Sequence, residues 1–565
     1  MIKENKSNSN EFSFTKPESY LEKSINQIPR LLSLQDRNRF SSTYGCFHRD
    51  YWLDKTSDFP DAVRQFGVQS LALVYKNKMP GNPYFDQEKI KDWAIAGLKF
   101  WAKIQHRDGS FDEFYPYERG WVGPTAFTTF TSVEAYKLLK QDMELDDINM
   151  LESVFRKAAY FISEGESEED HLANHHAMAA LAVWKVSEIL GDNQLKSNYE
   201  KLFEGFKKYH INDEGWSIEY DGIDPGYLSA TVSFLAKIYQ TNPDPEILEI
   251  AKKSIEMCSY FVYPNGFYAG SAGSRNTLHF YSHGFEVFAE EVPLAMSIAE
   301  KMLKALSENK LVPPEIISDR YVFYRVPEYL QSYLDYKQRQ INSPKIPYEK
   351  SSFTKYFDKA KVFVSKRDDK YILCNLAKGG VVKVFCTNTN KILHNDCGII
   401  GKLENNDIVT SQWVDPDYTY KTNPDGCEIS GRFNKVPSNK LFTPIKNIIF
   451  RSVLVLLGWS PTFSHYLKAK IRKTLILGQR NVPLQFTRSL HISDSGTVKL
   501  IDDLNIVGKI KIKDLSIGDE FFVRYVPQSR YFQSQELEVS GNSLDNEEIN
   551  TLNKVGNYKR EKLLS

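Results

Sequence analysis

The segment Asp108-Gly-Ser-Phe-Asp-Glu-Phe-Tyr115 joins a glycine to aromatic and acidic residues, and similar segments recur along the first half of the chain. The later copies are Asp213-Glu-Gly-Trp-Ser-Ile-Glu-Tyr220 and Pro264-Asn-Gly-Phe-Tyr-Ala-Gly270, and a degenerate copy begins at Glu164. Their glycines therefore recur with a period of about fifty residues, which lies in the range of repeat architectures. The four glycines are Gly109, Gly165, Gly215 and Gly266.

Each period of this repeat contains two helical patterns, such as residues 172–190 with 195–210 and residues 227–239 with 247–261. Neither helix of such a pair can bury its apolar face alone, so neighbouring pairs must stack. The repeat therefore predicts an α/α toroid of helical hairpins over residues 20–345. The glycine–aromatic turns should all lie at one end of the ring.

A second domain begins where the period changes, after Pro344 and Pro347. Short β-rich runs such as Val381-Val-Lys-Val-Phe-Cys386 alternate with turn residues. We predict an antiparallel β-sandwich over residues 346–530, with a helical insert at about 442–478. Residues 1–19 and 531–565 are polar and predict a flexible N-terminus and a C-terminal tail.

Composition excludes several classes of function. The 72 basic and 72 acidic residues cancel, so no global field favours nucleic acid. The six cysteines show neither a CxxC pair nor zinc-ligand spacing, so no metal site and no cofactor are predicted. The aromatic content of 13% suits a carbohydrate cleft, and it equally suits the packing of large helices.

No signal peptide and no transmembrane segment are visible, which favours a cytoplasmic location. The insert combines an apolar run from Ile448 to Leu457 with basic residues from Lys468 to Lys473. Such a helix could touch a membrane surface through residues 448–473. Packing of this helix on the sandwich is the expected arrangement.

The first candidate site lies in the segment 171–184, where Asn174, His175 and His176 open an apolar helix. Backbone amides point outward at a helix N-terminus, and the helix dipole favours anions there. An amide beside two imidazoles could therefore hold a carboxylate. A purely structural interpretation makes Asn174 the helix cap and the histidines surface residues.

Asn174-His175, followed by Tyr227, within a helical half and a β-sandwich, resembles the heparinase II/III and alginate-lyase superfamily. The resemblance implies a carbohydrate-active enzyme that cleaves a uronic-acid-containing polysaccharide by β-elimination. It also implies a histidine from the sandwich domain, for which His394 is the candidate. The chain departs from the family pattern at His176, where a glycine is frequent.

In that mechanism Asn174, His175 and Arg275 would neutralise the uronate carboxylate, and Tyr227 would be the base. An unperturbed tyrosine titrates near ~10, so neighbouring cations would have to lower its pKa. Further substrate-binding candidates lie in or beside the turns. They are His176, Glu113, Tyr115, Asp224, Trp216, Asn276 and His283.

Two other functions remain open from the sequence. An inverting glycoside hydrolase could use the turn carboxylates Glu113 and Asp224. A non-catalytic glycan-binding or scaffold protein would need only the aromatic cleft. Tyr227 could also be a core aromatic residue, and Arg275 a structural salt-bridge partner.

Overall fold

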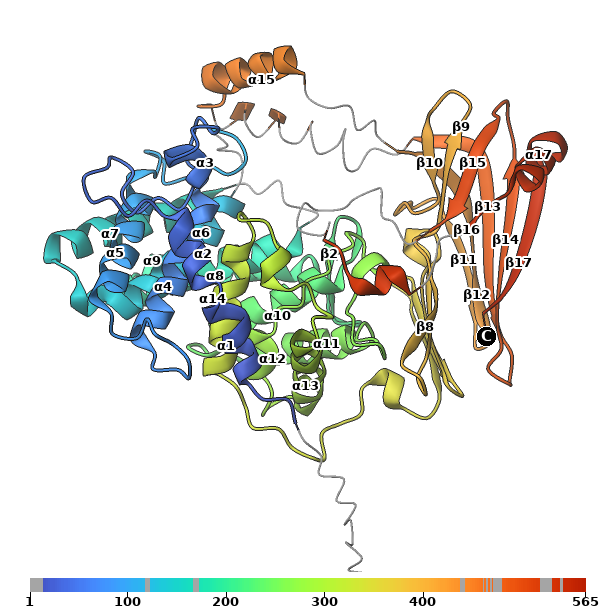
Figure 1. Cartoon of the computed structure of the whole chain (residues 1–565), viewed down its shortest axis with the longest axis horizontal. Helices are drawn as coiled ribbons and strands as arrows, with labels where there is room; N and C mark the ends of the chain where they lie inside the picture. The colour runs from blue at the N-terminus through green and yellow to red at the C-terminus, as the bar shows by residue number, and fades with distance from the viewer. Residues whose placement is uncertain are drawn as a thin grey trace, which may run out of the picture.

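A computed structural model describes residues 14–116, 122–165, 172–436, 443–460, 480–518, 531–538 and 542–564, with 462–463, 466–467 and 470. A helical domain and two β-sheets follow one another along the long axis of the molecule (Figure 1). This order confirms the predicted fold class, a helical toroid followed by an antiparallel β-sandwich.

Within the described residues, inner-ring helices contact one another in sequence, and the last contacts the first, so the ring closes. They are α4 (Gly67–Lys76), α6 (Gly123–Leu139), α8 (Ala173–Leu190), α10 (Pro225–Tyr239), α12 (His283–Val287) and α14 (Val322–Leu334). An outer layer packs around them. It consists of α1 (Glu18–Ile25), α5 (Glu88–Lys103), α7 (Leu145–Glu164), α9 (Asn193–Lys207), α11 (Pro245–Ser259) and α13 (Pro293–Ser307).

Burial distinguishes the two layers. Almost every residue of α8 from Ala173 to Ser187 is buried, because the helix is enclosed by α6, α10 and the outer layer. In α9 only a stripe is buried, formed by Leu195, Tyr199, Phe203 and Phe206 at helical spacing. A helix that is apolar all round belongs inside a fold, and a one-sided helix belongs at its surface.

The glycine turns fix how each hairpin meets the next. Gly109 and Gly215 have left-handed φ values of +94° and +74°. A Cβ added to Gly109 would lie 2.4 Å from the carbonyl oxygen of Lys157 in α7. A Cβ added to Gly215 would lie 2.3 Å from that of Lys253 in α11. Only glycine combines this backbone conformation with this close approach.

The same contact occurs at Gly45, a copy that the sequence analysis did not assign to the repeat. Gly45 has φ +93°, and its Cβ would lie 2.1 Å from the carbonyl oxygen of Ala96 in α5. Gly165 has an ordinary negative φ of −64°, so the degenerate copy does not form this turn. The turns at Gly45, Gly109 and Gly215 therefore all pack against helices of the outer layer.

The β-domain has two sheets among the described residues. The first is an antiparallel meander in chain order. Its strands are β4 (Phe353–Phe357), β5 (Val362–Arg367), β6 (Lys370–Asn375), β7 (Val381–Cys386) and β8 (Lys391–Asn395). The second runs in the order β16-β15-β9-β10-β12-β13-β14-β17, with β11 also paired to β12. Its outermost strands are β16 (Asn542–Ser543) and β17 (Asn557–Leu564). Its other strands are β9 (Ile399–Leu403), β10 (Ile408–Thr410), β11 (Thr419–Asn423), β12 (Gly426–Lys435), β13 (Asn481–Ile492), β14 (Val498–Ile506) and β15 (Ile512–Ile517).

The first sheet is buried on both faces. Val362, Val364 and Tyr371 pack with the toroid core, and alternate residues such as Phe363 and Ile372 pack with the second sheet. Successive side chains of a strand point to opposite faces, which explains this alternation. The molecule is therefore layered as toroid, first sheet and second sheet, with apolar contact at each boundary.

The C-terminus differs from the predicted polar tail. Residues 542–564 form β16 (Asn542–Ser543), α17 (Asn546–Val555) and β17 (Asn557–Leu564). β17 pairs with β14 along its whole length, from Asn505↔Asn557 to Val498↔Leu564. It is an edge strand with charged residues along it. Such a strand has too few apolar residues to be recognised as a strand from its composition.

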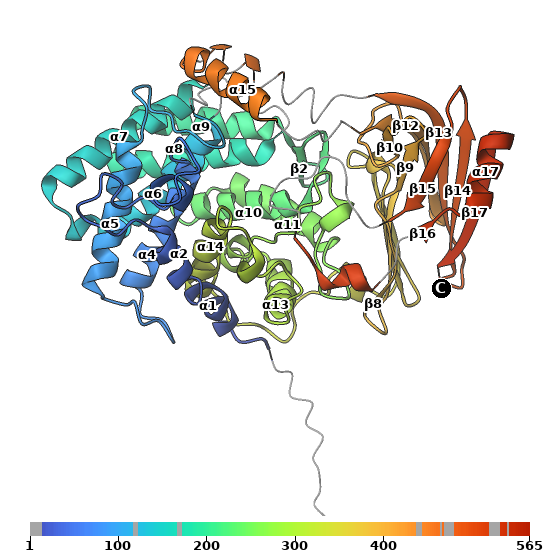
Figure 2. The same cartoon turned by 45° about the horizontal axis from the view of Figure 1, so that its top comes forward.

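The helical insert also differs from expectation, because its described helix contacts the toroid, where packing on the sandwich was expected. Helix α15 (Pro444–Leu457) places the ring of Phe450 edge-on to Tyr115, 5.0 Å between centroids. Arg451 pairs with Asp58 at 3.3 Å. Figure 2 shows α15 on the outer side of the helical domain. In the described part of the chain, no helix is long and apolar enough to cross a bilayer.

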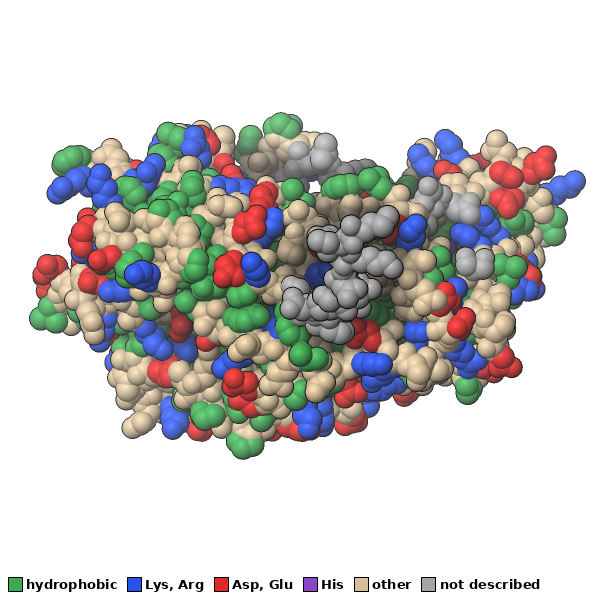
Figure 3. Space-filling view, turned by 60° about the horizontal axis from the view of Figure 1, so that its bottom comes forward, with side chains coloured by type: hydrophobic (Ala, Val, Ile, Leu, Met, Phe, Trp, Pro, Cys, Tyr) green, Lys and Arg blue, Asp and Glu red, His purple; other side chains and the backbone are tan. Residues whose placement is uncertain are grey.

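Surface charge is mixed on the face shown in Figure 3, where Lys and Arg side chains are interspersed with Asp and Glu. This agrees with the balanced composition of the sequence. Any attraction for an anionic ligand must therefore arise locally.

We predict that Gly215→Ala lowers stability by about 2–4 kcal/mol, because left-handed strain and the clash with α11 add. Gly191→Ala is the matched control. Gly191 has φ +60° but no atom within 4 Å of an added Cβ, so it should cost only about 1 kcal/mol. Thermal unfolding followed by far-ultraviolet circular dichroism compares the two. Equal losses would show that the contact with Lys253 contributes nothing.

Candidate active site

A cavity of about 260 Å³ opens among the inner helices of the toroid. Asn174 and Tyr227 line it from the first turns of α8 and α10. Lys237 and Gln331 line it from the last turns of α10 and α14, so the cavity runs along the helices. The positive ends of helix dipoles at Asn174 and Tyr227 favour an anionic ligand.

The structure brings together four of the residues predicted for catalysis. Asn174, His175, Tyr227 and Arg275 all line this cavity. Two of them come from the N-terminus of α8, one from α10 and one from the loop before α12. Of the substrate-binding candidates, Glu113 lines the same cavity.

Asn174 is held by a buried carboxylate, Glu219, at the end of β2 (Trp216–Glu219). The side-chain Nδ2 of Asn174 donates to both carboxylate oxygens at 2.8 Å, and its backbone N–H donates at 2.7 Å. Burial raises the pKa of Glu219 well above its usual value, although the bonds from Asn174 oppose this. The amide nitrogen of Asn174 is thus engaged within the protein.

Tyr227 is placed by a second buried carboxylate, Asp224, which caps α10. Asp224 accepts the backbone N–H of Tyr227 at 3.1 Å through Oδ1 and that of Arg275 at 2.9 Å through Oδ2. One carboxylate therefore joins the α10 N-terminus to the loop that carries Arg275. Asp224 is fully buried and does not line the cavity.

Arg275 lies over the ring of Tyr220, 3.7 Å from its centroid. Tyr220 and Asp221 form the two-residue turn between β2 and β3 (Gly222–Ile223), with φ of +53° and +70°. A bulky residue in left-handed conformation is uncommon and strained, and such strain concentrates at functional sites. Here it directs an aromatic ring to the guanidinium.

The sandwich domain holds the Arg275 loop from behind. Lys378, between β6 and β7, donates from Nζ to the carbonyls of Ser271 and Gly273, both at 2.7 Å. Asn375 donates to the carbonyl of Ala272 at 2.7 Å. The described cavity lining contains no sandwich residue, so the sandwich acts on the site through this loop.

The phenol of Tyr227 has a higher pKa than that of an exposed tyrosine, so it loses its proton less readily. Burial raises its pKa well above 10, the neighbouring Tyr220 adds to the rise, and Arg275 opposes it. The resemblance implied that neighbouring cations would lower this pKa. Arg275 does act in that direction, but desolvation is the larger effect.

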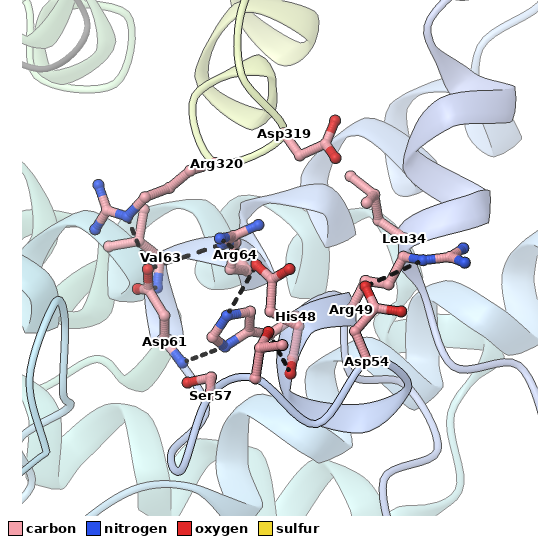
Figure 4. Close-up of polar contacts among 12 residues, drawn as sticks. Leu34, His48, Arg49, Asp54, Ser57, Asp61, Val63, Arg64, Asp319 and Arg320 are labelled. Carbon is pink, nitrogen blue, oxygen red and sulfur yellow. Dashed lines mark hydrogen bonds and ion pairs between the residues drawn. The ribbon is translucent and has the colours of Figure 1, made fainter. Parts of the chain in front are cut away.

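A second arginine, Arg320, lines the cavity and was missed in the sequence. Its Nη2 donates to Glu113 at 2.5 Å and its Nε to Asp61 at 2.8 Å. His48 accepts the backbone N–H of Asp61 through Nδ1, as Figure 4 shows. Burial and then Arg64 lower the pKa of His48 to about 4, so this imidazole is neutral.

A buried polar network surrounds Lys237, which lines the cavity from the last turn of α10. Its Nζ contacts Nδ1 of His283 at 2.8 Å and Glu328 at 3.2 Å. His283 also pairs through Nε2 with Asp335 at 2.7 Å. His283, a substrate-binding candidate, is fully buried and does not line the cavity itself.

The structure does not bring His394 to the cavity. It is buried in β8, where its Nε2 contacts Asp396 at 2.6 Å. Burial opposes ionisation of Asp396, yet Arg488 and His394 hold its pKa well below the usual value. His394 therefore belongs to an ion-pair cluster between the two sheets.

The remaining substrate-binding candidates lie outside the cavity lining. The ring of His176 stacks on Tyr209, 4.6 Å between centroids. Trp216 is buried and donates to Glu214. Asn276 has a left-handed φ of +57° in the Arg275 loop. Tyr115 meets Phe450 of α15 at the rim.

No group of three or more His, Cys, Asp or Glu able to hold a metal ion occurs among the residues that the structure describes. All six cysteines are buried, and none forms a disulfide.

Comparison with known proteins adds the class. Residues 83–284 match the family model of the ulvan lyase N-terminal domain, a range that contains all four predicted catalytic residues lining the cavity. No curated protein sequence matches the chain.

A chondroitin AC lyase from Streptomyces coelicolor A3, solved with chondroitin sulphate, has a similar structure. Its TM-score is 0.53 at 8% identity, over 92% of this chain and 69% of that lyase. A heparinase III gives 0.43 at 11% identity, over 91% and 74%. A heparan sulfate lyase mutant from Pedobacter heparinus gives 0.41 at 11% identity, over 87% and 70%.

The fold and the domain match together support a polysaccharide lyase built from an α/α toroid and a β-sandwich, as the sequence predicted. Residues 83–284 of the helical domain are similar to the ulvan lyase N-terminal domain.

We predict that His394→Ala destabilises the sandwich but leaves turnover within about threefold of wild type, because no catalytic cavity atom is lost. Removing one partner of a buried hydrogen bond, here the contact of His394 with Asp396, costs about 1–3 kcal/mol. Thermal unfolding and initial rates measure the two effects. A hundredfold loss of turnover in a folded variant would instead show that His394 takes part in the reaction.

Proposed function

We propose that this chain cleaves a uronic-acid-containing polysaccharide by β-elimination, with Tyr227 as the proton carrier. The observation that supports this most is the convergence of Tyr227, Arg275, His175 and Asn174 on one cavity. A cavity of about 260 Å³ suits one sugar unit, so a polymer would extend past its mouth. The named substrates of the similar proteins, ulvan, chondroitin and heparan sulfate, motivate the uronate class.

Binding would begin with the uronate carboxylate at Arg275. Its guanidinium is fixed by the ring of Tyr220 and by the bond from its backbone N–H to Asp224. The N-terminal ends of α8 and α10 add positive potential beside it. Neutralising the carboxylate makes the adjacent C5–H bond acidic enough to lose a proton, because negative charge develops on that group.

The chemical step would remove the C5 proton to the phenolate of Tyr227. The C5–H electron pair forms the C4=C5 double bond, and the C4–O bond breaks. The protonated phenol can then return its proton to the leaving oxygen, which restores the phenolate. His175, which lines the same cavity, would contact the sugar or its carboxylate.

Asn174 would act mainly by holding neighbouring parts of the site in position. Its Nδ2 is bound to Glu219, and this bond ties the start of α8 to the hairpin carrying Tyr220. Asn174 is therefore a positioning residue in this proposal, as well as part of the cavity wall.

The two carboxyl groups named for the hydrolase alternative, Glu113 and Asp224, are both engaged within the protein. Asp224 is fully buried, and both of its carboxylate oxygens accept hydrogen bonds from backbone N–H groups. Glu113 pairs with Arg320. Two carboxyl groups on opposite sides of a glycosidic bond are required for hydrolysis. A non-catalytic glycan-binding protein would bind the polymer with no turnover.

Tyr227→Phe should lower kcat by about 10²–10⁴-fold and leave substrate affinity nearly unchanged, because only the proton carrier is lost. Turnover is measured on uronic-acid polymers by the ultraviolet absorbance of the unsaturated product. Tyr220→Phe is the matched control, since its ring would remain under Arg275. If Tyr220→Phe loses as much activity as Tyr227→Phe, or Tyr227→Phe loses none, the assignment of the base is wrong.

The pH dependence provides a separate test. Because the pKa of Tyr227 is raised, only a small fraction of the enzyme carries the phenolate at neutral pH. We expect kcat/KM to rise by about tenfold per pH unit through the neutral range and into the alkaline range. A plateau above about pH 7 would instead indicate a histidine base, because histidine titrates near ~6.5.

A further inference from the structure

Helix α15 exposes an apolar stripe to solvent. Ile448 is 66% exposed, Leu456 67% and Trp459, just beyond the helix, 60%. Such a stripe normally faces a protein core, and a contiguous exposed apolar surface marks a site of interaction. The large apolar residues of the stripe are Ile445, Ile448, Ile449, Val455, Leu456 and Trp459.

The opposite side of α15 is occupied by the toroid. Leu454 is buried, Phe450 contacts Tyr115, and Arg451 pairs with Asp58. Residues 450 and 454 are one turn apart, whereas the exposed residues recur at 448, 455 and 459 on the far side. The stripe is therefore held outward by specific contacts on its back.

The surrounding sequence carries one sign of charge. Between Glu428 and Asp494 there is no acidic residue, in a chain whose total charge is balanced. This contrasts with the mixed face in Figure 3. The basic residues of the interval are Arg432, Lys435, Lys440, Lys446, Arg451, Lys468, Lys470, Arg472, Lys473, Arg480 and Arg488.

We propose that α15 docks this enzyme on an anionic lipid surface, lying in the plane of the membrane. Ile, Leu and Val side chains suit the acyl boundary, Trp459 suits the interface, and the lysines suit anionic headgroups. The fourteen residues of α15 span about 21 Å, too short to cross a bilayer. A polyanionic polysaccharide matches the charge but offers no apolar surface for the stripe.

A second copy of this chain is a weaker occupant, because it would bring together two intervals that contain no acidic residue of their own. Docking on lipid would also have a consequence for the site. Tyr115, beneath α15, follows Glu113 and Phe114, which line the cavity. The part of the cavity lined by Glu113 and Phe114 would thus lie near the membrane surface.

The test is co-sedimentation of the full chain with vesicles, one set of phosphatidylcholine with phosphatidylglycerol (3:1) and one of phosphatidylcholine alone. The double variant Ile448→Ser/Leu456→Ser removes two residues of the stripe. The matched control is Ile341→Ser/Leu145→Ser, whose residues are 75% and 68% exposed but lie elsewhere. A third variant, Lys446→Gln/Lys470→Gln, tests charge.

We expect wild type and the control to bind anionic vesicles, with binding weakened by salt and absent on neutral vesicles. The stripe variant should lose at least tenfold in affinity, and the charge variant should lose affinity on anionic vesicles. Turnover on a soluble oligosaccharide should stay unchanged in the stripe variant. Equal binding by stripe variant and wild type, no binding by wild type, or a dimer in sedimentation velocity that only the stripe variant dissolves would overturn the proposal.

Discussion

Two carboxylates that never face the cavity hold its walls together. Glu219 ties the α8 N-terminus to the β2–β3 hairpin, and Asp224 ties the α10 N-terminus to the Arg275 loop. Burying such groups is costly, and hydrogen bonds from backbone N–H groups offset that cost. These two anchors fix the relative positions of the three segments that supply the proposed catalytic groups and of the hairpin that carries Tyr220. Precise geometry is what proton transfer from carbon requires.

The repeat that builds the ring also builds the cavity. Five residues after the glycines at 109 and 215, an aromatic residue takes a left-handed conformation with φ of +49° and +53°. An arginine lies over each of these rings, at 3.9 and 3.7 Å from the centroid. The pairs are Phe114 with Arg320 and Tyr220 with Arg275. Their environments differ. Arg320 pairs with two carboxylates, whereas Arg275 lies on the ring of Tyr220 and its backbone N–H donates to Asp224.

Local sequence patterns predicted the toroid and the positions of Asn174 and Tyr227. Both residues lie at the start of a helix, and short stretches of sequence carry the signals for a helix start. Arg320 could not be found this way, since its partners lie more than 200 residues earlier in the chain. His394 was chosen by resemblance, yet Asp396, two residues later, binds it within the sandwich. The strand β17 was missed because an edge strand with one covered face has a polar sequence.

The sandwich contributes to the site by support. Lys378 and Asn375 hold the backbone of residues 271–273, and Asp224 holds the next part of the same loop. The loop is therefore clamped from the toroid on one side and from the first sheet on the other. Because that sheet is apolar on both faces, it cannot slide against the toroid without exposing core residues. The position of Arg275, and with it the charge available to a bound carboxylate, thus depends on the packing between domains.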